Sequence, residues 1–265
     1  MDALSALQIT IGIFTQLIPV WVAMGIILSL SLYYRQHLGL YGHLFDSRVG
    51  TMGLVLVLFW VLTAIFADLI ITHDPLGQIS GMKNKGIGFP VRGAEGTFYL
   101  LGGDNLARDI FSRVVMGSRS VLTIAPAATV FAFMVGITLG LPAGYRSGTL
   151  DTVLSFLSNL VLAFPVILLF FLLVTPEIRS TGVPIYLAAV LFVFPIILFV
   201  VLFQSRFYTQ PIKRNIYVAI TLVLGFWAYS GLAFNMDPLG VFYMEPNLLN
   251  IFVAVVFVNS PTVFR

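Results

Sequence analysis

The densest group of ionisable side chains lies between residues 101 and 119, in a chain that is otherwise poor in charge. Within it, Asp104 stands where a helix N-cap is expected, because a carboxylate there accepts the free backbone amides of a first turn. Asp109 and Arg113 are four residues apart with the acid first, which is the favourable order for an ion pair on a helix. These residue types and spacings predict capping and ion pairing rather than bond-breaking chemistry.

The same stretch predicts a short amphipathic helix at a membrane surface. Gly117 is expected to end it, before a membrane span begins just beyond Arg119. Its apolar side chains repeat beside Arg108 and Ser112, at Ile110, Phe111, Val114 and Val115. Two interpretations are open: a helix that merely tethers two spans, or a rigid elbow that shapes the outer mouth of a transport path.

Other candidates for catalysis or metal binding are few. The chain has no cysteine and three dispersed histidines, and it contains no HExxH, nucleophile-elbow, dinucleotide-binding or ATP-binding P-loop motif. The one acidic residue inside a predicted span, Asp68, lies near the outer end of that span, where an interfacial position is expected. We therefore expect no enzyme activity, and no metal or cofactor held by this chain.

Composition indicates the elements that position these residues. The chain has 265 residues, of which 59% are hydrophobic and 9% charged, whereas soluble domains have about a quarter charged residues. This excludes a soluble enzyme and a disordered chain. Apolar runs of about 20 residues match helices that cross a ~30 Å hydrocarbon layer, and not the short alternating strands of a barrel. Its basic residues are dispersed, which argues against nucleic-acid binding.

An all-α polytopic membrane protein with about seven spans is therefore predicted. The spans are placed at residues 8–33, 50–72, 121–142, 153–174, 185–203, 216–234 and 248–264. Basic residues of the short loops gather on one side, which the positive-inside rule makes cytoplasmic: Arg35, Arg48, Arg146, Arg206, Lys213, Arg214 and Arg265, against Arg179 alone on the other side. The N-terminus and the long loop 74–119 are then outside.

Small residues and prolines mark the helix faces. A ridge with a spacing of four runs along the third span and its inner end, at Ala128, Ala132, Gly136, Gly140 and Gly144. Such a ridge allows close approach of another helix, either within this chain or from a partner subunit. Pro165 and Pro195 interrupt the fourth and fifth spans, so kinks are expected there.

Residues 101–119 resemble the signature of the dipeptide/oligopeptide-type ABC importer permeases. The spacing of that signature is kept by Leu101, Gly102, Asp104, Arg108, Asp109, Ser112, Arg113, Gly117 and Arg119, whereas Gly103 and Ala107 replace the usual Thr and Gly. Further similar segments are 73–76, 141–145, 162–165 and 260–265. The resemblance covers about residues 50–175 and 248–265.

This resemblance implies a permease subunit that moves peptides or similar small solutes across the bacterial inner membrane. It implies a heterodimer with a homologous permease, two cytoplasmic ATPases that bind ATP and Mg²⁺, and a periplasmic solute-binding protein. A stand-alone secondary transporter or channel is the alternative, but it predicts an inverted repeat and polar midplane residues that the sequence does not show.

Two departures from the family pattern are expected to matter. Residues 1–49 form an additional N-terminal span and cytoplasmic loop, and two helices at about 185–234 are inserted into a partial permease domain of residues 50–265. The family's cytoplasmic coupling helix, with its Glu-Ala-Ala segment, is not present. The chain is either an N-terminal fragment that ends before that coupling loop, which is the interpretation we favour, or a protein that has lost its means of coupling.

Overall fold

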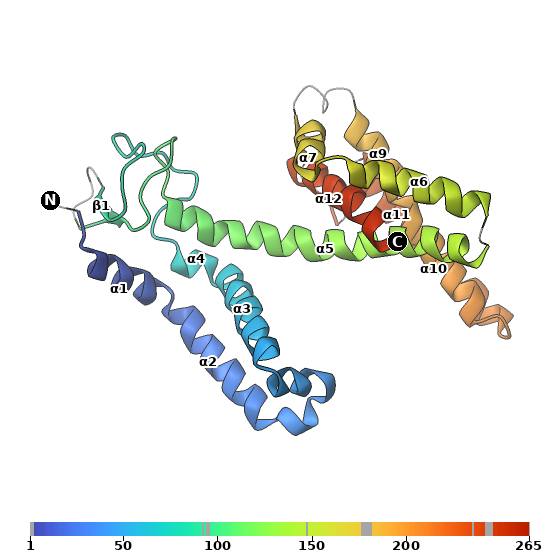
Figure 1. Ribbon diagram of the computed structural model, residues 1–265, viewed down its shortest axis with the longest axis horizontal. Helices are drawn as coiled ribbons and strands as arrows, with labels where there is room; N and C mark the ends of the chain where they lie inside the picture. Colours follow the sequence, from blue (N-terminus) through green and yellow to red (C-terminus); the bar gives the residue numbers. More distant parts are fainter. Residues whose placement is uncertain are drawn as a thin grey trace. The chain divides into compact units, whose positions relative to one another are not determined.

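A computed structural model describes residues 3–91, 93, 96–146, 148–175, 182–234, 236–241 and 246–264 (Figure 1). Over these ranges the protein is built from helices joined by loops, with one two-stranded sheet, which confirms the predicted all-α membrane architecture. The chain divides into two compact units, Met1–Thr123 and Ile124–Arg265, and each is described by itself. The basic residues Arg179 and Arg265, used above for orientation, lie outside the described residues.

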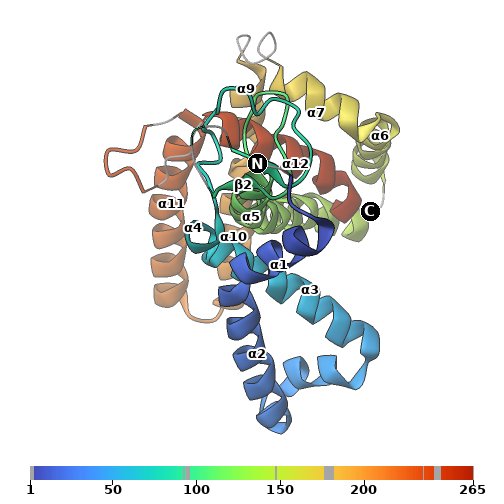
Figure 2. The same cartoon turned by 90° about the vertical axis from the view of Figure 1, so that its left-hand side faces the viewer.

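The first unit begins with helices α1 (Ala6–Gln16) and α2 (Ile18–Tyr33), which are bent by 56° where they meet. Pro19 stands in the first turn of α2, and it cannot donate the backbone hydrogen bond that would continue α1. Two 3₁₀ helices, η1 (Arg35–His37) and η2 (Gly39–Asp46), then join α2 to α3 (Arg48–Ile65), and α3 contacts α2 (Figure 2).

The segment after the short helix α4 (Ala67–Ile70) is mostly irregular. Strands β1 (Phe89–Pro90) and β2 (Phe98–Tyr99) form its antiparallel sheet, with Phe89 opposite Tyr99. Met82, Val91 and Tyr99 are buried together and give this segment a small hydrophobic core of its own. The segment, residues 71–109, is therefore folded and not a flexible linker, and it is called the outer module after its predicted position.

Helix α5 (Ile110–Tyr145) continues unbroken through Gly117 and through Pro126. The prediction of a separate short interfacial helix that ends at Gly117 was therefore wrong. A single glycine costs a helix about 1 kcal/mol relative to alanine, which the apolar residues on either side outweigh. The amphipathic residues 110–116 are the first turns of the span itself.

Among its described residues, the second unit contains the rest of α5 and the helices α6 (Thr149–Ala163), α7 (Val166–Val174), α9 (Val183–Leu191), α10 (Val193–Arg206), α11 (Pro211–Phe234) and α12 (Pro246–Phe264). Helix α12 packs against α6, α7 and α9, and α10 packs along α11. Phe131, Phe192 and Phe252 meet in the core with ring centroids 5.2–5.9 Å apart.

Each of the seven predicted spans corresponds to a helix or a helix pair. Four helical stretches of the described residues satisfy the length and hydropathy of a span by themselves: Arg48–Ile65 (α3), Ile110–Tyr145 (α5), Ile185–Arg206 (α9 together with α10) and Pro211–Phe234 (α11). The predicted spans 8–33 and 153–174 are bent pairs, and 248–264 is a shorter apolar helix. Pro165 lies between α6 and α7, whose axes meet at 86°, whereas Pro195 lies in the first turn of α10.

Candidate functional site

The charged signature stretch begins where α5 emerges from the outer module. Asp109 precedes the first residue of α5, and its side chain accepts the backbone amides of Phe111 (3.3 Å) and Ser112 (3.1 Å). Asp109 thus caps the helix and satisfies amides that have no partner within it. The N-cap was predicted at Asp104, five residues too early, because the pattern did not reveal the turn at 104–108.

A buried polar cluster ties the start of α5 to the segment after α4. Thr72 Oγ1 donates to Asp109 Oδ2 at 2.9 Å, and Ser112 Oγ donates to the same oxygen at 2.6 Å. Ser112 Oγ in turn accepts the backbone amides of Thr72 and His73, both at 3.1 Å. Asp109 and Ser112 are fully buried. Because every polar atom of this cluster has a partner, it fixes the entry of α5 rather than reacting.

The electrostatics of the cluster favour the carboxylate form of Asp109. Burial alone would raise the pKa of this carboxyl group, but hydrogen bonds with His73, Ser112 and Thr72 outweigh burial and hold the pKa below its ordinary value. Tyr99 lies beside His73, with its ring in an edge-to-face arrangement at 4.9 Å. Burial and the charge of Asp109 raise the pKa of Tyr99, so its hydroxyl stays protonated and donates to the carbonyl of Ala107.

A second charged cluster closes the turn before the helix. Asp104 Oδ1 accepts the amides of Leu106 (2.8 Å) and Arg108 (2.9 Å), while Oδ2 accepts Nε of Arg108 at 2.8 Å and pairs with Arg113. These hydrogen bonds overcome partial burial and hold the pKa of Asp104 well below its usual range. The predicted ion pair between Asp109 and Arg113 was wrong, because Asp109 caps the helix and Arg113 reaches back to Asp104 instead.

The last basic residue of the signature joins α5 to α4. Arg119 donates to both carboxylate oxygens of Asp68, at 2.8 Å and 3.2 Å, and its Nε donates to the carbonyl of Ala64 at 3.0 Å. Asp68 was expected at an interface, and its partner was not foreseen. The planar guanidinium group matches a carboxylate in this two-pronged arrangement, which gives geometric specificity to the contact.

Gly103 and Ala107, the two residues that differ from the usual signature, lie where the backbone restricts the side chain. A side chain at Gly103 would place its Cβ 2.1 Å from the carbonyl oxygen of Met82, so only glycine fits there. Ala107 has φ +63°, in the left-handed region where the glycine usual at this position is unstrained. The backbone of this protein therefore requires the glycine at 103, where the signature usually has Thr, and the turn at 104–107 carries some strain at Ala107.

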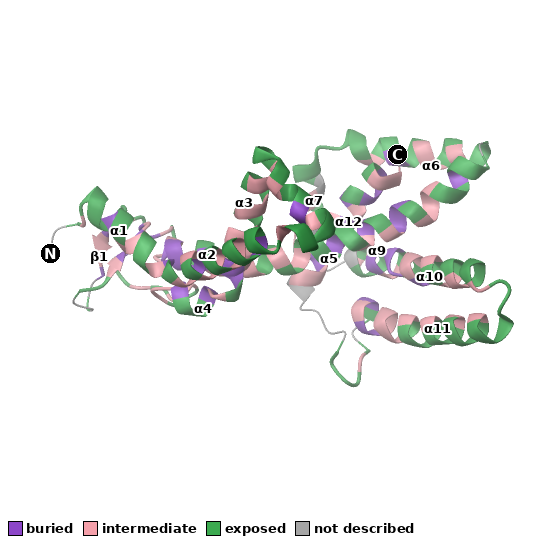
Figure 3. Ribbon diagram, turned by 90° about the horizontal axis from the view of Figure 1, so that it is seen from below, coloured by how far each residue is buried: buried purple, intermediate pink, exposed green. Residues whose placement is uncertain are grey.

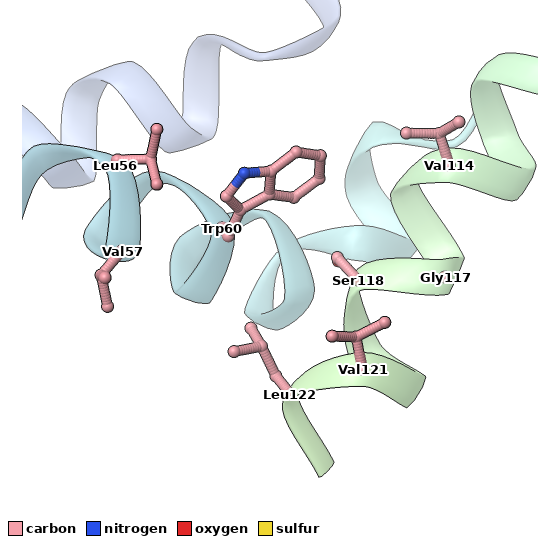
Figure 4. Close-up of a pocket in the computed structure, with 8 residues that line it drawn as sticks. All are labelled: Leu56, Val57, Trp60, Val114, Gly117, Ser118, Val121 and Leu122. Atoms are coloured by element: carbon pink, nitrogen blue, oxygen red, sulfur yellow. The ribbon is translucent and has the colours of Figure 1, made fainter. Parts of the chain in front are cut away.

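Gly117 lies on the side of α5 that faces α3. A Cβ at this position would meet no atom within 4 Å, and the residue borders an apolar groove of about 430 Å³ (Figure 4). The indole of Trp60 extends across the space between the two helices, with Leu56, Val57, Val121 and Leu122 around it.

The small-residue ridge lies in the second unit, where most of it meets this chain's own helices. Ala128 and Ala132 are fully buried. A Cβ at Gly136 would lie 2.6 Å from the side chain of Val263, and one at Gly140 would lie 3.3 Å from the carbonyl of Phe264, so α12 packs against this ridge. A Cβ at Gly144 would meet nothing within 4 Å.

The arrangement offers no catalytic constellation among the described residues. Ser112, His73 and Asp109 are neighbours, yet the serine hydroxyl donates to the carboxylate and accepts two backbone amides, which leaves no lone pair for attack. No group of three potential metal ligands occurs in the described part of the chain. Sequence reasoning missed the contacts of Thr72, His73 and Tyr99. Thr72 and His73 bind Ser112, about 40 positions along the chain, and Tyr99 packs against His73, which no local spacing reveals.

Comparisons with known proteins identify relatives of part of the chain. It is 31% identical over 128 residues to the dipeptide transport system permease protein of Alkalihalophilus pseudofirmus, covering 46% of this chain and 38% of that protein. It is 33% identical over 126 residues to the protein of the same name from Haemophilus influenzae, covering 47% of this chain and 41% of that protein. The glutathione transport system permease protein of Pectobacterium atrosepticum is 45% identical over 69 residues, covering 26% of this chain and 23% of that protein.

These similarities confirm the resemblance predicted from the signature, over about half of the chain. The chain spans less than half the length of the curated relatives it matches. No protein-family model matches it, and no solved structure matches it.

Proposed function

We propose that this chain is a membrane-spanning permease subunit of a bacterial ABC importer for peptides or similar small solutes. The observation that carries the proposal is the similarity of about half of the chain to permease proteins of dipeptide transport systems. The charged signature supports it, because Asp104, Asp109 and Arg119 each make specific contacts at the outer start of α5. The chain itself would break no covalent bond.

The partners and location follow from the same proposal. A homologous permease would complete the path, two cytoplasmic ATPases would bind ATP and Mg²⁺ and drive it, and a solute-binding protein would deliver the solute at the outer face. The location would be the inner membrane, with the segment 74–119 outside. Four span-length helices in the described ranges, and two further bent pairs, support a multi-pass membrane protein.

The role that the geometry supports for the outer module is mechanical. Two carboxylates, Asp104 and Asp109, hold the turn and the helix start, and Arg119 joins α5 to α4. Any movement of α5 would therefore be shared with α4 and with the folded segment between them. Of the two interpretations left open by the sequence, these contacts support the rigid elbow.

The test is solute uptake driven by a separate ATPase. The complete gene is expressed with the ATPase, permease and binding-protein genes that accompany it, in cells without their own peptide permeases, and uptake of labelled di- and tripeptides is measured. We expect uptake that is lost when the ATPase carries a substitution of its phosphate-binding lysine. Uptake by proteoliposomes that contain this protein alone, without ATP, would contradict the proposal and favour a stand-alone transporter.

A matched pair of variants tests the elbow. Arg119→Gln removes the contact with Asp68, whereas Lys83→Gln removes one charge from an exposed loop position. We expect Arg119→Gln to lower uptake at equal protein level and Lys83→Gln to leave it unchanged. Equal uptake by both variants would show that the α4–α5 contact has no part in transport.

A further inference from the structure

Helices α10 and α11 form a hairpin whose inner side is not filled. A groove of about 420 Å³ runs between them and the core of the second unit. Large apolar and aromatic side chains border it, among them Pro195, Phe199, Phe203, Tyr217, Ile220 and Leu224. The groove opens outward, since Tyr217, Ile220 and Leu224 are 42%, 47% and 50% exposed, and most of both helices is exposed (Figure 3).

One end of this groove is a stack of aromatic rings. Phe207 and Tyr217 are nearly parallel, with centroids 4.9 Å apart, and Phe203 lies 5.3 Å from Tyr217. Phe199 continues the stack at 6.2 Å from Phe203. The stack lies near the tip of the hairpin, where α10 ends at Arg206 and α11 begins at Pro211.

The same tip carries three cations without an acid. Arg206, Lys213 and Arg214 are its charged residues, and the whole of 193–234 contains no Asp or Glu. Arg206 follows Phe203 by three positions and Arg214 precedes Tyr217 by three, so each arginine shares a helix face with a stacked ring. Nε of Arg214 donates to the side chain of its neighbour Asn215 at 3.3 Å. The positive charge therefore stands at the aromatic end of the groove.

This combination fits one kind of occupant. Close helix–helix contacts in membranes rely on small residues, but the glycine that borders this groove, Gly225, is already used: a Cβ there would lie 2.9 Å from Ile196. An uneven groove of aromatic and branched side chains suits a flexible hydrocarbon chain instead. Basic residues next to such a groove, on the cytoplasmic side by the positive-inside rule, suit a phosphate head group.

We propose that the α10–α11 hairpin binds one anionic phospholipid of the cytoplasmic leaflet. Its phosphate lies between Arg206, Lys213 and Arg214, and an acyl chain fills the groove bordered by Phe199, Phe203 and Tyr217. The proposal does not depend on the transported solute, nor on transport itself. It gives a role to the two inserted helices, for which the family resemblance provides none.

The experiment measures lipid retention by the purified protein with native mass spectrometry. Dioleoyl-phosphatidylglycerol and dioleoyl-phosphatidylethanolamine are titrated separately, since they share acyl chains and differ in net charge. We expect one tightly bound phosphatidylglycerol and weaker phosphatidylethanolamine. Lys213→Gln with Arg214→Gln should weaken phosphatidylglycerol binding roughly 30-fold, because each cation near an anionic surface contributes about a fivefold factor.

Two further variants separate the head group from the acyl chain. The control double variant, Arg48→Gln with Lys83→Gln, also removes two positive charges, but at positions far from the hairpin tip in sequence. Its phosphatidylglycerol binding should be unchanged. Thr221→Phe fills the groove without changing charge, and it should weaken both lipids. Helicity and monodispersity are measured for each variant. Equal phosphatidylglycerol binding by the tip and control variants, or undiminished binding to Thr221→Phe, would overturn the proposal.

A measurement on the unaltered protein avoids any folding defect of the variants. Phosphatidylglycerol with a diazirine in one acyl chain is cross-linked in proteoliposomes, and the labelled peptides are identified. We expect labels concentrated in residues 195–203 and 217–232. Labels spread evenly over all lipid-facing helices, or a groove protected by a protein partner, would refute the assignment.

Discussion

Ala107 is the position at which the structure makes its sharpest quantitative prediction. Its φ of +63° places an L-residue in the left-handed region, which costs roughly 1–2 kcal/mol. Replacement by glycine removes that strain. It also removes the partly buried methyl group of Ala107, which packs against the core of Met82, Val91 and Tyr99. The lost hydrophobic burial costs about 0.4 kcal/mol if half of this carbon is buried. Glycine also gains freedom in the unfolded chain, which costs roughly 0.4–1 kcal/mol.

The balance predicts that Ala107→Gly stabilises the outer module by about 0.5 kcal/mol. Hydrogen exchange at the amide of Ile79, which donates to the carbonyl of Ala107, should slow by roughly twofold. Ala107→Val should have the opposite sign and a larger size, about 1–2 kcal/mol, because a branched side chain is strained further at positive φ.

Ala23 is the matched control, since it is half-buried in the same unit but lies within α2. Ala23→Gly should cost about 1 kcal/mol, as glycine does in a helix. The reasoning fails if glycine destabilises position 107 as much as position 23. It fails as well if glycine and valine at position 107 have equal stability.

Further predictions concern the polar clusters, the packing of α5 and the topology. Asp109→Asn should lower the free energy of unfolding by about 2–3 kcal/mol, because an amide cannot accept all the donors that the carboxylate now accepts, and thermal unfolding in detergent measures this. Gly136→Leu should destabilise the second unit by about 1–3 kcal/mol through its contact with Val263, whereas Gly117→Ala should be neutral or stabilising; equal melting temperatures for the two variants would contradict the helix packing. The pKa values of Asp104 and Asp109 are lowered in the folded protein, so both carboxylates stabilise the folded state fully above the unfolded pKa of about 3.9. This contribution is lost as the pH falls below that value, and the melting temperature should fall with it. A melting temperature that already drops between pH 7 and 5 would show that other groups dominate. A cysteine introduced by Gly86→Cys should be labelled from outside and one introduced by Gln210→Cys from the cytoplasm, and the reverse pattern would defeat the orientation.

The helical architecture was predictable because the lengths of the apolar segments, and the positions of the charged residues between them, indicate where the chain crosses a membrane. The 36-residue helix α5 was predicted only in part, since Gly117 and Pro126 are residues that often interrupt helices. Within a long apolar span, the neighbouring backbone hydrogen bonds outweigh both. The bend at Pro165 follows from proline chemistry, but the sequence does not reveal its angle.

The outer site was predictable as a set of residues but not as a set of contacts. The spacing of Asp104, Arg108 and Asp109 identified the charged stretch, yet helical periodicity suggested the wrong partner for Arg113. The pairing of residues four apart holds only within a helix. Residues 104–108 form a turn and α5 begins only at Ile110, so Asp109 lies before the helix and not within it. Contacts with Thr72 and His73 depend on the folded loop between them, which no local spacing encodes.

The length of α5 has a consequence for how the protein meets its surroundings. At 1.5 Å per residue its 36 residues extend about 54 Å, whereas the hydrocarbon layer is about 30 Å thick and head groups bring it to about 45 Å. A tilt of about 40° would reduce its length along the membrane normal only to roughly 41 Å. The helix is therefore longer than the hydrocarbon layer is thick at any usual tilt. Where α5 crosses a membrane, part of the helix therefore lies beyond the hydrocarbon layer. The ion pairs and hydrogen bonds around its first turns can then lie at the depth of the head groups, where charged side chains meet water.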